Sequence, residues 1–175
     1  KNLVGTFYPP RLVLADPIVL SSLGDRAFRS GLYEVVKHAI LVGGSLFRRL
    51  EASLETLRPA NIKGLEGILA AAARVKIDVV SRDEREAGLR RVLNLGHTFG
   101  HALEEATGYG RFMHGEAVGW GLLAATRLAE RLGILPTTEA ARIARLVRRV
   151  GPLPSIRDLK PAQILKLLPR DKKAV

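Results

Sequence analysis

The sequence predicts a mainly α-helical domain with one short strand near its start. Its 175 residues, 47% of them hydrophobic, are enough for a real core and exclude a disordered chain. Most of the chain has the apolar spacing of helices, in segments that end at glycine or proline. Only residues 11–16, RLVLAD, have the pattern of a strand. We therefore expect residues 1–175 to form a single helical domain rather than a self-contained α/β enzyme.

Most of the expected helices have a start or a stop signal. Asp25 can cap the first helix and Gly43 ends it, while Pro59 stops the second. Gly108 ends the fourth helix, and Thr138 can cap the sixth. We find no repeat, low-complexity tract or internal linker. Helices are expected over residues 25–42, 45–57, 65–82, 89–106, 115–132, 138–150 and 161–168.

The composition excludes several kinds of chemistry and partner. The chain contains no cysteine, which removes disulfides, thiolate catalysis and cysteine-ligated zinc, and fits a reducing cytoplasm. No apolar run reaches the length needed to span a membrane. The formal net charge of +11 raises nucleic acid as a partner. However, aromatic residues are only 5% and no nucleic-acid-binding motif is present, so we expect a solvated basic surface instead.

A stripe of polar residues follows one face of the helix expected over residues 89–106. At 100° per residue, Arg90, Asn94, His97 and His101 fall close together on this face. Two histidines four apart on a helix can converge on one metal ion, and arginine can bind an anion. The alternative is a solvated face with two hydrogen-bonded histidines.

Two further helices carry charges where apolar residues are expected. Glu34 and Lys37 are neighbours on the very apolar helix RSGLYEVVKHAILV, where buried charge needs a partner. They form either an internal ion pair or a carboxylate ligand with a basic neighbour. Lys76 stands on an otherwise apolar face of the helix over residues 65–82. Its ammonium group either reaches water along its long stem or lies in a cleft for an anionic ligand.

His114 begins the helix in FMHGEAVGWG, where it can cap the helix or bring a metal ligand from another element. Glu116 in the same first turn suits the helix dipole and needs no further role. Together, Glu34, His97 and His114 would form a set of two histidines and one carboxylate, which leaves a coordination position open as in a catalytic zinc site. The groups expected around this site for proton transfer and anion binding are His101, Lys37, Lys76 and Arg90.

Several segments, in order and at similar spacing, resemble the 3-dehydroquinate synthase family. The segment KNLVGTFYPPRLVLADP resembles the region after the glycine-rich nucleotide motif of that family, and RSGLYEVVKHAIL resembles its Glu-x-x-Lys helix. The longest similar segment is KIDVVSRDEREAGLRRVLNLGHTFGHALE, followed by HGEAVGWGL and RDKKAV. The resemblance implies the helical, metal- and substrate-binding C-terminal domain of this fold, without its nucleotide-binding α/β half.

The resemblance assigns roles residue by residue. The implied metal ligands, for Zn²⁺ or Co²⁺, are Glu34, His97 and His114. The implied substrate-binding residues are Asn2, Lys37, Lys76, Arg90, Asn94, His101 and Lys172, and among them His101, Lys37 and Asn94 are the implied catalytic residues. The implied NAD contacts are Lys1, Val19, Leu20, Ser21 and Ser22.

The family converts 3-deoxy-D-arabino-heptulosonate 7-phosphate into 3-dehydroquinate and phosphate, a lyase reaction of the shikimate pathway that uses NAD and a divalent metal. The resemblance implies the same activity here, in a cytoplasmic homodimer. Asn94 and His101 resemble the dehydroquinate-forming members. The alternatives are another sugar-phosphate cyclase, a metal-dependent polyol dehydrogenase or, from a different class, a basic helical nucleic-acid-binding module.

The sequence contains no glycine-rich loop for a dinucleotide phosphate. The expected strand ends in Asp16-Pro17, and proline offers no backbone N–H to a pyrophosphate. The chain also begins at Lys1 without methionine, which suggests a fragment. We therefore expect the chain alone to lack NAD-dependent turnover.

Overall fold

The computed structural model describes residue 8 and residues 10–170, and these residues contain helices and no strand. The mainly helical fold expected from the sequence is therefore confirmed. The helices are η1 (Pro17–Ser22), α1 (Asp25–Val42), α2 (Gly44–Ser53), η2 (Leu54–Thr56), α3 (Ile62–Arg82), η3 (Leu89–Asn94), α4 (His97–Ala106), α5 (His114–Arg131), α6 (Thr137–Arg149), α7 (Pro161–Leu167) and η4 (Leu168–Arg170), where η denotes a 3₁₀ helix. In the described part of the chain, no helix is both long and apolar enough to span a membrane.

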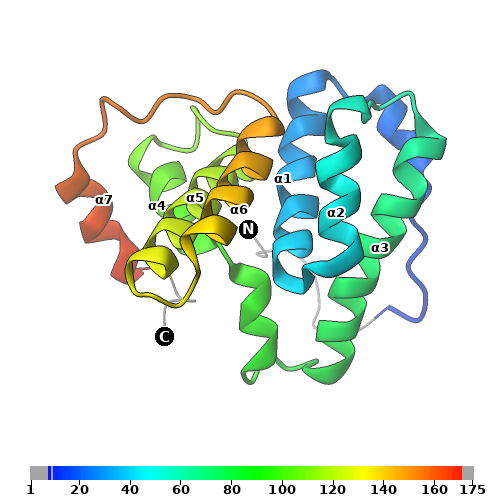
Figure 1. The fold of residues 1–175 in the computed structure, drawn as a ribbon, viewed down its shortest axis with the longest axis horizontal. Helices are drawn as coiled ribbons and strands as arrows, with labels where there is room; N and C mark the ends of the chain where they lie inside the picture. Colours follow the sequence, from blue (N-terminus) through cyan, green and yellow to red (C-terminus); the bar gives the residue numbers. More distant parts are fainter. Residues whose placement is uncertain (1–7, 9, 171–175) are drawn as a thin grey trace.

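Helix α1 lies at the centre of the domain (Figure 1). It packs against α2 and α3 on one side and against α5 and α6 on the other. Helix α5 also packs against α4, which in turn carries α7 at the far end of the molecule. Residues from three segments far apart in the sequence, on α1, α4 and α5, therefore meet in the middle of the fold.

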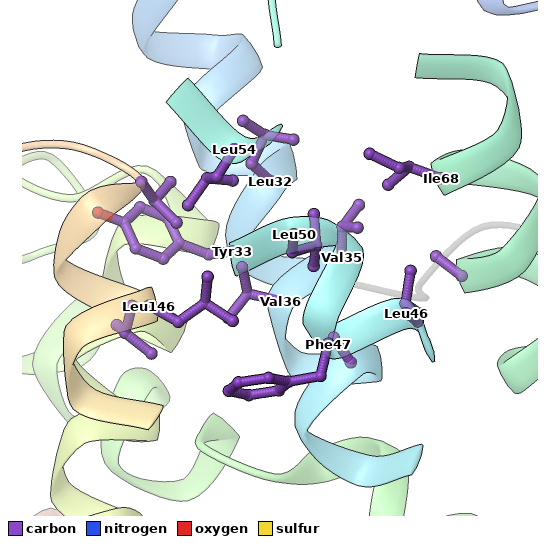
Figure 2. Close-up of a cluster of buried hydrophobic side chains, with 14 of the residues drawn as sticks. Leu32, Tyr33, Val35, Val36, Leu46, Phe47, Leu50, Leu54, Ile68 and Leu146 are labelled. Carbon is purple, nitrogen blue, oxygen red and sulfur yellow. The ribbon is translucent and has the colours of Figure 1, made fainter. Parts of the chain in front are cut away.

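The larger of two apolar cores surrounds α1 (Figure 2). Tyr33 and Val36 of α1, Leu50 of α2 and Leu146 of α6 are 0–1% exposed. Burying one such side chain typically stabilises a fold by about 1.5–3 kcal/mol. The Tyr33 hydroxyl donates to the carbonyl of Gly151 at 3.0 Å, so this polar atom has a partner. A second, smaller core joins α4, α5 and α7, and contains Ala102, Leu103, Phe112, Ala117 and Ile164.

The strand expected over residues 11–16 is not formed, and that prediction is wrong. A strand needs the backbone groups of a second strand, and the described residues contain none. The side chains of Leu12, Val13 and Leu14 are 72–86% exposed. After them, Asp16 caps an unexpected 3₁₀ helix, η1, by accepting a hydrogen bond from the Ile18 amide at 2.9 Å.

The helix expected over residues 89–106 is broken. The prediction that its polar residues form a single stripe on one helix face is therefore wrong. The segment divides into η3 and α4 at Gly96, whose φ of +80° is left-handed and favours glycine. Arg90 and Asn94 therefore lie on a 3₁₀ turn, whereas His97 and His101 lie on the first turns of α4. The other expected helices have bounds within a few residues of those observed. Helix α3 begins at Ile62, three residues before the expected start at residue 65. The Asn61 side chain caps it there by accepting a hydrogen bond from the Gly64 amide at 3.1 Å.

Candidate metal and substrate site

Glu34 of α1 presents one carboxylate oxygen to which no residue in the described part of the chain donates a hydrogen bond. Its Oε2 atom accepts from Lys37 Nζ at 2.5 Å, and the Lys37 side chain is almost fully buried. Its Oε1 atom is buried and has no hydrogen-bond partner within the described residues. A buried carboxylate oxygen without a donor is costly, and a bound cation is one way to satisfy it.

Two histidine nitrogens face this oxygen. His97 Nε2 lies 3.5 Å from Glu34 Oε1, and His114 Nε2 lies 3.8 Å from the same atom. One ligand atom from each of the three residues lies within 4.8 Å of the others, a spacing that can hold one metal ion. Two imidazoles and one carboxylate suit zinc or a similar divalent ion, and three protein ligands leave a position open. The three residues therefore fit the metal that the sequence led us to expect.

The electrostatics of Glu34 and His97 favour the protonation states that metal binding requires. The pKa of His97 is lowered to about 4, because burial disfavours the charged ring and Lys37 repels it. Burial acts to raise the pKa of Glu34, but Lys37 and the two histidines outweigh it and the net shift is downward. At neutral pH, Glu34 is thus anionic and His97 is neutral.

Glycine lets the helices that carry these side chains approach closely. A Cβ atom on Gly121 of α5 would lie 1.8 Å from the carbonyl oxygen of Gly96, immediately before His97. A Cβ atom on Gly115 would lie 1.8 Å from the carbonyl oxygen of Ser30 on α1. Both distances are impossible, so these positions require glycine. The two close approaches bring the first turns of α4 and α5 to the Glu34 face of α1.

Glu116 also holds the start of α5 in place. The residue is 5% exposed, and its carboxylate accepts hydrogen bonds from Arg26 Nε and Nη2 at 2.7 and 2.8 Å. It accepts in addition from the Met113 amide at 2.9 Å. The sequence placed Glu116 only at the helix dipole, whereas in the fold it joins the first turns of α5 and α1, next to His114.

The His101 ring packs against the two other histidines of this site. Its ring centroid lies 5.4 Å from that of His97 and 5.9 Å from that of His114. Glu104 lies one turn further along α4 and contacts the Nδ1 atom of His114, whereas Glu34 faces Nε2. The two carboxylate oxygens of Glu104 are 3.3 and 3.2 Å from His114 Nδ1. His101, Glu104 and His114 form a second set with metal-ligand spacing.

A cavity of about 280 Å³ opens beside Glu34. Lys76 of α3, although exposed, lines this cavity together with His97 and His114. Arg90 and Asn94 of η3 reach it despite the break in the helix. Its lining residues are Glu34, Lys37, His38, Lys76, Glu86, Arg90, Leu93, Asn94, His97 and His114. Three cationic side chains against two carboxylates make it suitable for an anion.

Asp83, which the sequence pattern did not indicate as a site residue, organises the loop before Arg90. Asp83 accepts from the backbone amides of Ala87, Gly88 and Arg90 at 2.8, 2.9 and 2.8 Å. These three bonds hold the pKa of the Asp83 carboxyl below its usual range. Glu86 in this loop has a left-handed φ of +58° and accepts from Asn94 Nδ2 at 3.4 Å. Nothing in the charged run SRDEREAGLR distinguishes these two carboxylates from surface ones.

The other expected site residues lie elsewhere. Val19, Leu20, Ser21 and Ser22 form the end of η1, which packs against α3 and does not line the cavity. They therefore remain predicted NAD contacts. Lys1, Asn2 and Lys172 lie outside the described residues.

The fold and the site define a helical domain with a candidate metal centre beside a cationic cavity, the arrangement of a metal-dependent enzyme. The family profile described as 3-dehydroquinate synthase C-terminal matches residues 31–174. The chain therefore belongs to the 3-dehydroquinate synthase C-terminal family.

Individual relatives agree with this assignment. The chain is 42% identical over 175 residues to a 3-dehydroquinate synthase of Solibacter usitatus, covering 100% of this chain and 49% of that protein. It is 46% identical over 177 residues to that of Crocosphaera subtropica, covering 99% of this chain and 48% of the relative. The chain thus spans about half the length of the curated relatives it matches.

Solved structures of related cyclases have the same fold. A 2-epi-5-epi-valiolone synthase from Streptomyces hygroscopicus, solved with NAD⁺ and Zn²⁺ bound, matches with a TM-score of 0.82 and 29% identity, over 97% of this chain and 48% of that one. A 2-deoxy-scyllo-inosose synthase, complexed with carbaglucose-6-phosphate, NAD⁺ and Co²⁺, matches with a TM-score of 0.79 and 32% identity, over 99% of this chain and 47% of that one.

Proposed function

We propose that this chain is the metal- and substrate-binding half of a 3-dehydroquinate synthase, which converts 3-deoxy-D-arabino-heptulosonate 7-phosphate into 3-dehydroquinate and phosphate. The observation that carries the proposal is the buried Oε1 atom of Glu34, which has no hydrogen-bond partner among the described residues and is faced by the Nε2 atoms of His97 and His114 beside a cationic cavity. Full-length relatives with 42–46% identity to this chain are named 3-dehydroquinate synthase, which supports this substrate.

Glu34, His97 and His114 would hold a zinc or cobalt ion, which would act as a Lewis acid on substrate hydroxyls, while NAD would supply a hydride acceptor. The side chains around the cavity have separate tasks. Lys37, Lys76 and Arg90 bind and orient a substrate that carries a carboxylate and a phosphate, and the planar guanidinium of Arg90 suits a bidentate contact.

Asn94 and His101 have the remaining two tasks. Asn94 lines the cavity and can donate to or accept from a substrate hydroxyl. His101 lies against both histidines of the metal set and is the group that we assign to hold and move a proton at a substrate hydroxyl. Asn2 and Lys172 are proposed to complete substrate binding, on their resemblance to the family.

The whole enzyme would have two domains. Since the relatives are about twice as long as the matched region, we propose a nucleotide-binding half that carries most of the NAD site. Lys1 and Val19–Ser22 would add contacts to NAD from this chain. On the family resemblance, we further propose a cytoplasmic homodimer, and that turnover requires both halves.

The second candidate function is another sugar-phosphate cyclase, because the solved structures that match this fold are cyclases that form other rings. The two functions differ in substrate. We would assay the full-length protein, with NAD and zinc, for phosphate release from the heptulosonate phosphate and from hexose and heptulose phosphates without a carboxylate. Preference for the heptulosonate supports the proposal, whereas turnover of only the carboxylate-free sugars contradicts it. Glu34→Ala should abolish release, while Glu66→Ala, at an exposed position on α3, should not change it.

A further inference from the structure

Glu104 is a buried acid with no role in the proposed chemistry. The residue is 7% exposed and lies on α4, the helix that also carries Ala102 and Leu103 of the second core. Both of its carboxylate oxygens lie within 3.3 Å of His114 Nδ1. Burial of a carboxylate is costly unless the group makes a specific interaction, so this contact requires an explanation.

The two nitrogens of His114 face different partners. Nε2 faces Glu34 Oε1 at 3.8 Å, whereas Nδ1 faces Glu104. A neutral imidazole carries one proton, and a nitrogen that binds a metal must be the one without it. A carboxylate can only accept a hydrogen bond, so Glu104 stabilises the tautomer with the proton on Nδ1 and leaves the Nε2 lone pair free.

We propose that Glu104 is a positioning residue of the metal centre: it fixes the Nδ1–H tautomer and the ring orientation of His114, so that Nε2 points at Glu34 and His97. The inference rests on the proposed metal centre. It concerns a residue that would bind neither the metal nor the substrate, and it predicts that metal affinity depends on a side chain outside the ligand set.

The other histidine of the set offers an internal comparison. His97 Nδ1 lies 3.3 Å from the carbonyl oxygen of Leu95, at the break between η3 and α4. The backbone thus fixes the tautomer of His97, and no side-chain substitution can remove that acceptor. His114 is the histidine of the pair whose tautomer depends on a side chain, which makes Glu104 the informative position.

The alternative role for Glu104 is as a ligand, together with His101 and His114, of a second ion. This arrangement competes with the first site for His114. If both ions were bound at once, His114 would use both nitrogens and lose its remaining proton, which a neutral imidazole does not do readily. Positioning needs only the neutral ring, so the structure favours it.

The test uses Glu104→Gln, which keeps the size of the side chain. A glutamine amide can either accept from Nδ1–H or donate to Nδ1, so it no longer selects a tautomer. We would label the histidines of the purified protein with ¹⁵N and determine the His114 tautomer by NMR without metal. Zinc affinity and stoichiometry would be measured by competition with a chelator, and thermal unfolding would report the fold. Glu66→Gln, on the exposed face of α3, is the control.

The wild type and Glu66→Gln should show Nδ1–H at His114 and bind one zinc ion. Glu104→Gln should show a mixture of tautomers and bind zinc about 10- to 100-fold more weakly, still at one per chain. Glu104→Ala should weaken zinc binding at least as much. An unchanged tautomer and affinity in folded Glu104→Gln would overturn the proposal, as would two zinc ions in the wild type and one in the variant. If the wild type binds no zinc, the metal centre is wrong, and the tautomer comparison still decides the role of Glu104.

Discussion

Lys37 acts on more than one titrating group near the cavity. It forms an ion pair with Glu34, and its charge lowers the pKa of both His97 and His38, after burial as the larger cause. The sequence indicated an unusual charged pair at Glu34 and Lys37, because the surrounding helix is so apolar. It gave no reason to select His38, whose burial beside Lys37 depends on how α1 packs.

The two histidines with lowered pKa predict a stability that falls with acid. Each has a pKa of about 4 in the fold, against 6.5 ordinarily. Between these values the unfolded chain binds protons that the folded chain does not, so stability is retained above pH 6.5 and lost as the pH falls toward 4. The loss should approach about 1.4 kcal/mol per pH unit for each histidine only once the unfolded ring is largely protonated; it is about half as steep near pH 6.5, and solvent screening of these partly exposed rings reduces it further. Urea unfolding of the metal-free protein at pH 6.5, 6 and 5.5 should show this slope, and His38→Gln should halve it. Equal slopes in the two proteins would contradict the shift at His38.

Asp83 predicts an effect on anion binding without being in the cavity. Its three backbone hydrogen bonds shape the loop that presents Arg90. Asp83→Asn replaces one acceptor oxygen with an NH₂ group that faces amide donors, so the loop should loosen. We expect inorganic phosphate to bind about 10-fold more weakly, because the loop would hold Arg90 less firmly at the cavity. Calorimetric titration of Asp83→Asn against Asp78→Asn, an exposed position on α3, measures this. Equal phosphate affinity in both variants would contradict the role of Asp83 in presenting Arg90.

Among the helices, the crossing of α4 and α5 decides whether the site forms. The sequence predicted most helix bounds, because Gly and Pro mark them locally. The capping expected of Asp25 and Thr138 is wrong: both lie inside their helices, whose N-caps are Gly24 and Pro136. The sequence did not predict the break at Gly96, because the cause is not local: the backbone there lies against Gly121, which is 25 residues away along the chain. The strand expected over residues 11–16 failed for a related reason, since a strand depends on a partner and the described residues provide none.

Gly121→Ala tests this crossing. The added methyl group would overlap the Gly96 carbonyl, so α4 and α5 must separate and His97 must move with α4. We expect a loss of about 1–3 kcal/mol in the free energy of unfolding, together with weaker zinc binding. Gly31→Ala on α1 is the matched control, because its Cβ would meet nothing within 4 Å. It should stabilise the helix by up to about 1 kcal/mol and leave zinc binding unchanged. Similar losses in both variants would show that the close crossing is not what holds the site.

Across the whole molecule, several of the basic side chains that raised nucleic acid as a partner form ion pairs within the fold. Arg142 of α6 binds Glu51 through Nε and Nη2 at 2.7 and 2.5 Å. Arg149 binds Glu55 at 2.8 Å and donates to the carbonyl of Glu51 at 2.8 Å. These side chains join α6 to α2, which contains Glu51, and to η2, which contains Glu55. Arg142 and Arg149 therefore have a structural role, and the charges for which we propose a function are the few that line the cavity on α1, α3 and η3.

Three helices bring Glu34, His97 and His114 together, and we propose that these residues hold one metal ion. The most direct measurement is a crystal structure of the protein with zinc, in which anomalous scattering locates the ion. We predict one strong peak bounded by Glu34 Oε1, His97 Nε2 and His114 Nε2, at about 2.0–2.2 Å from each atom. A peak on His101 and Glu104 instead, or a zinc-saturated crystal with no ion between the three residues, would contradict the account.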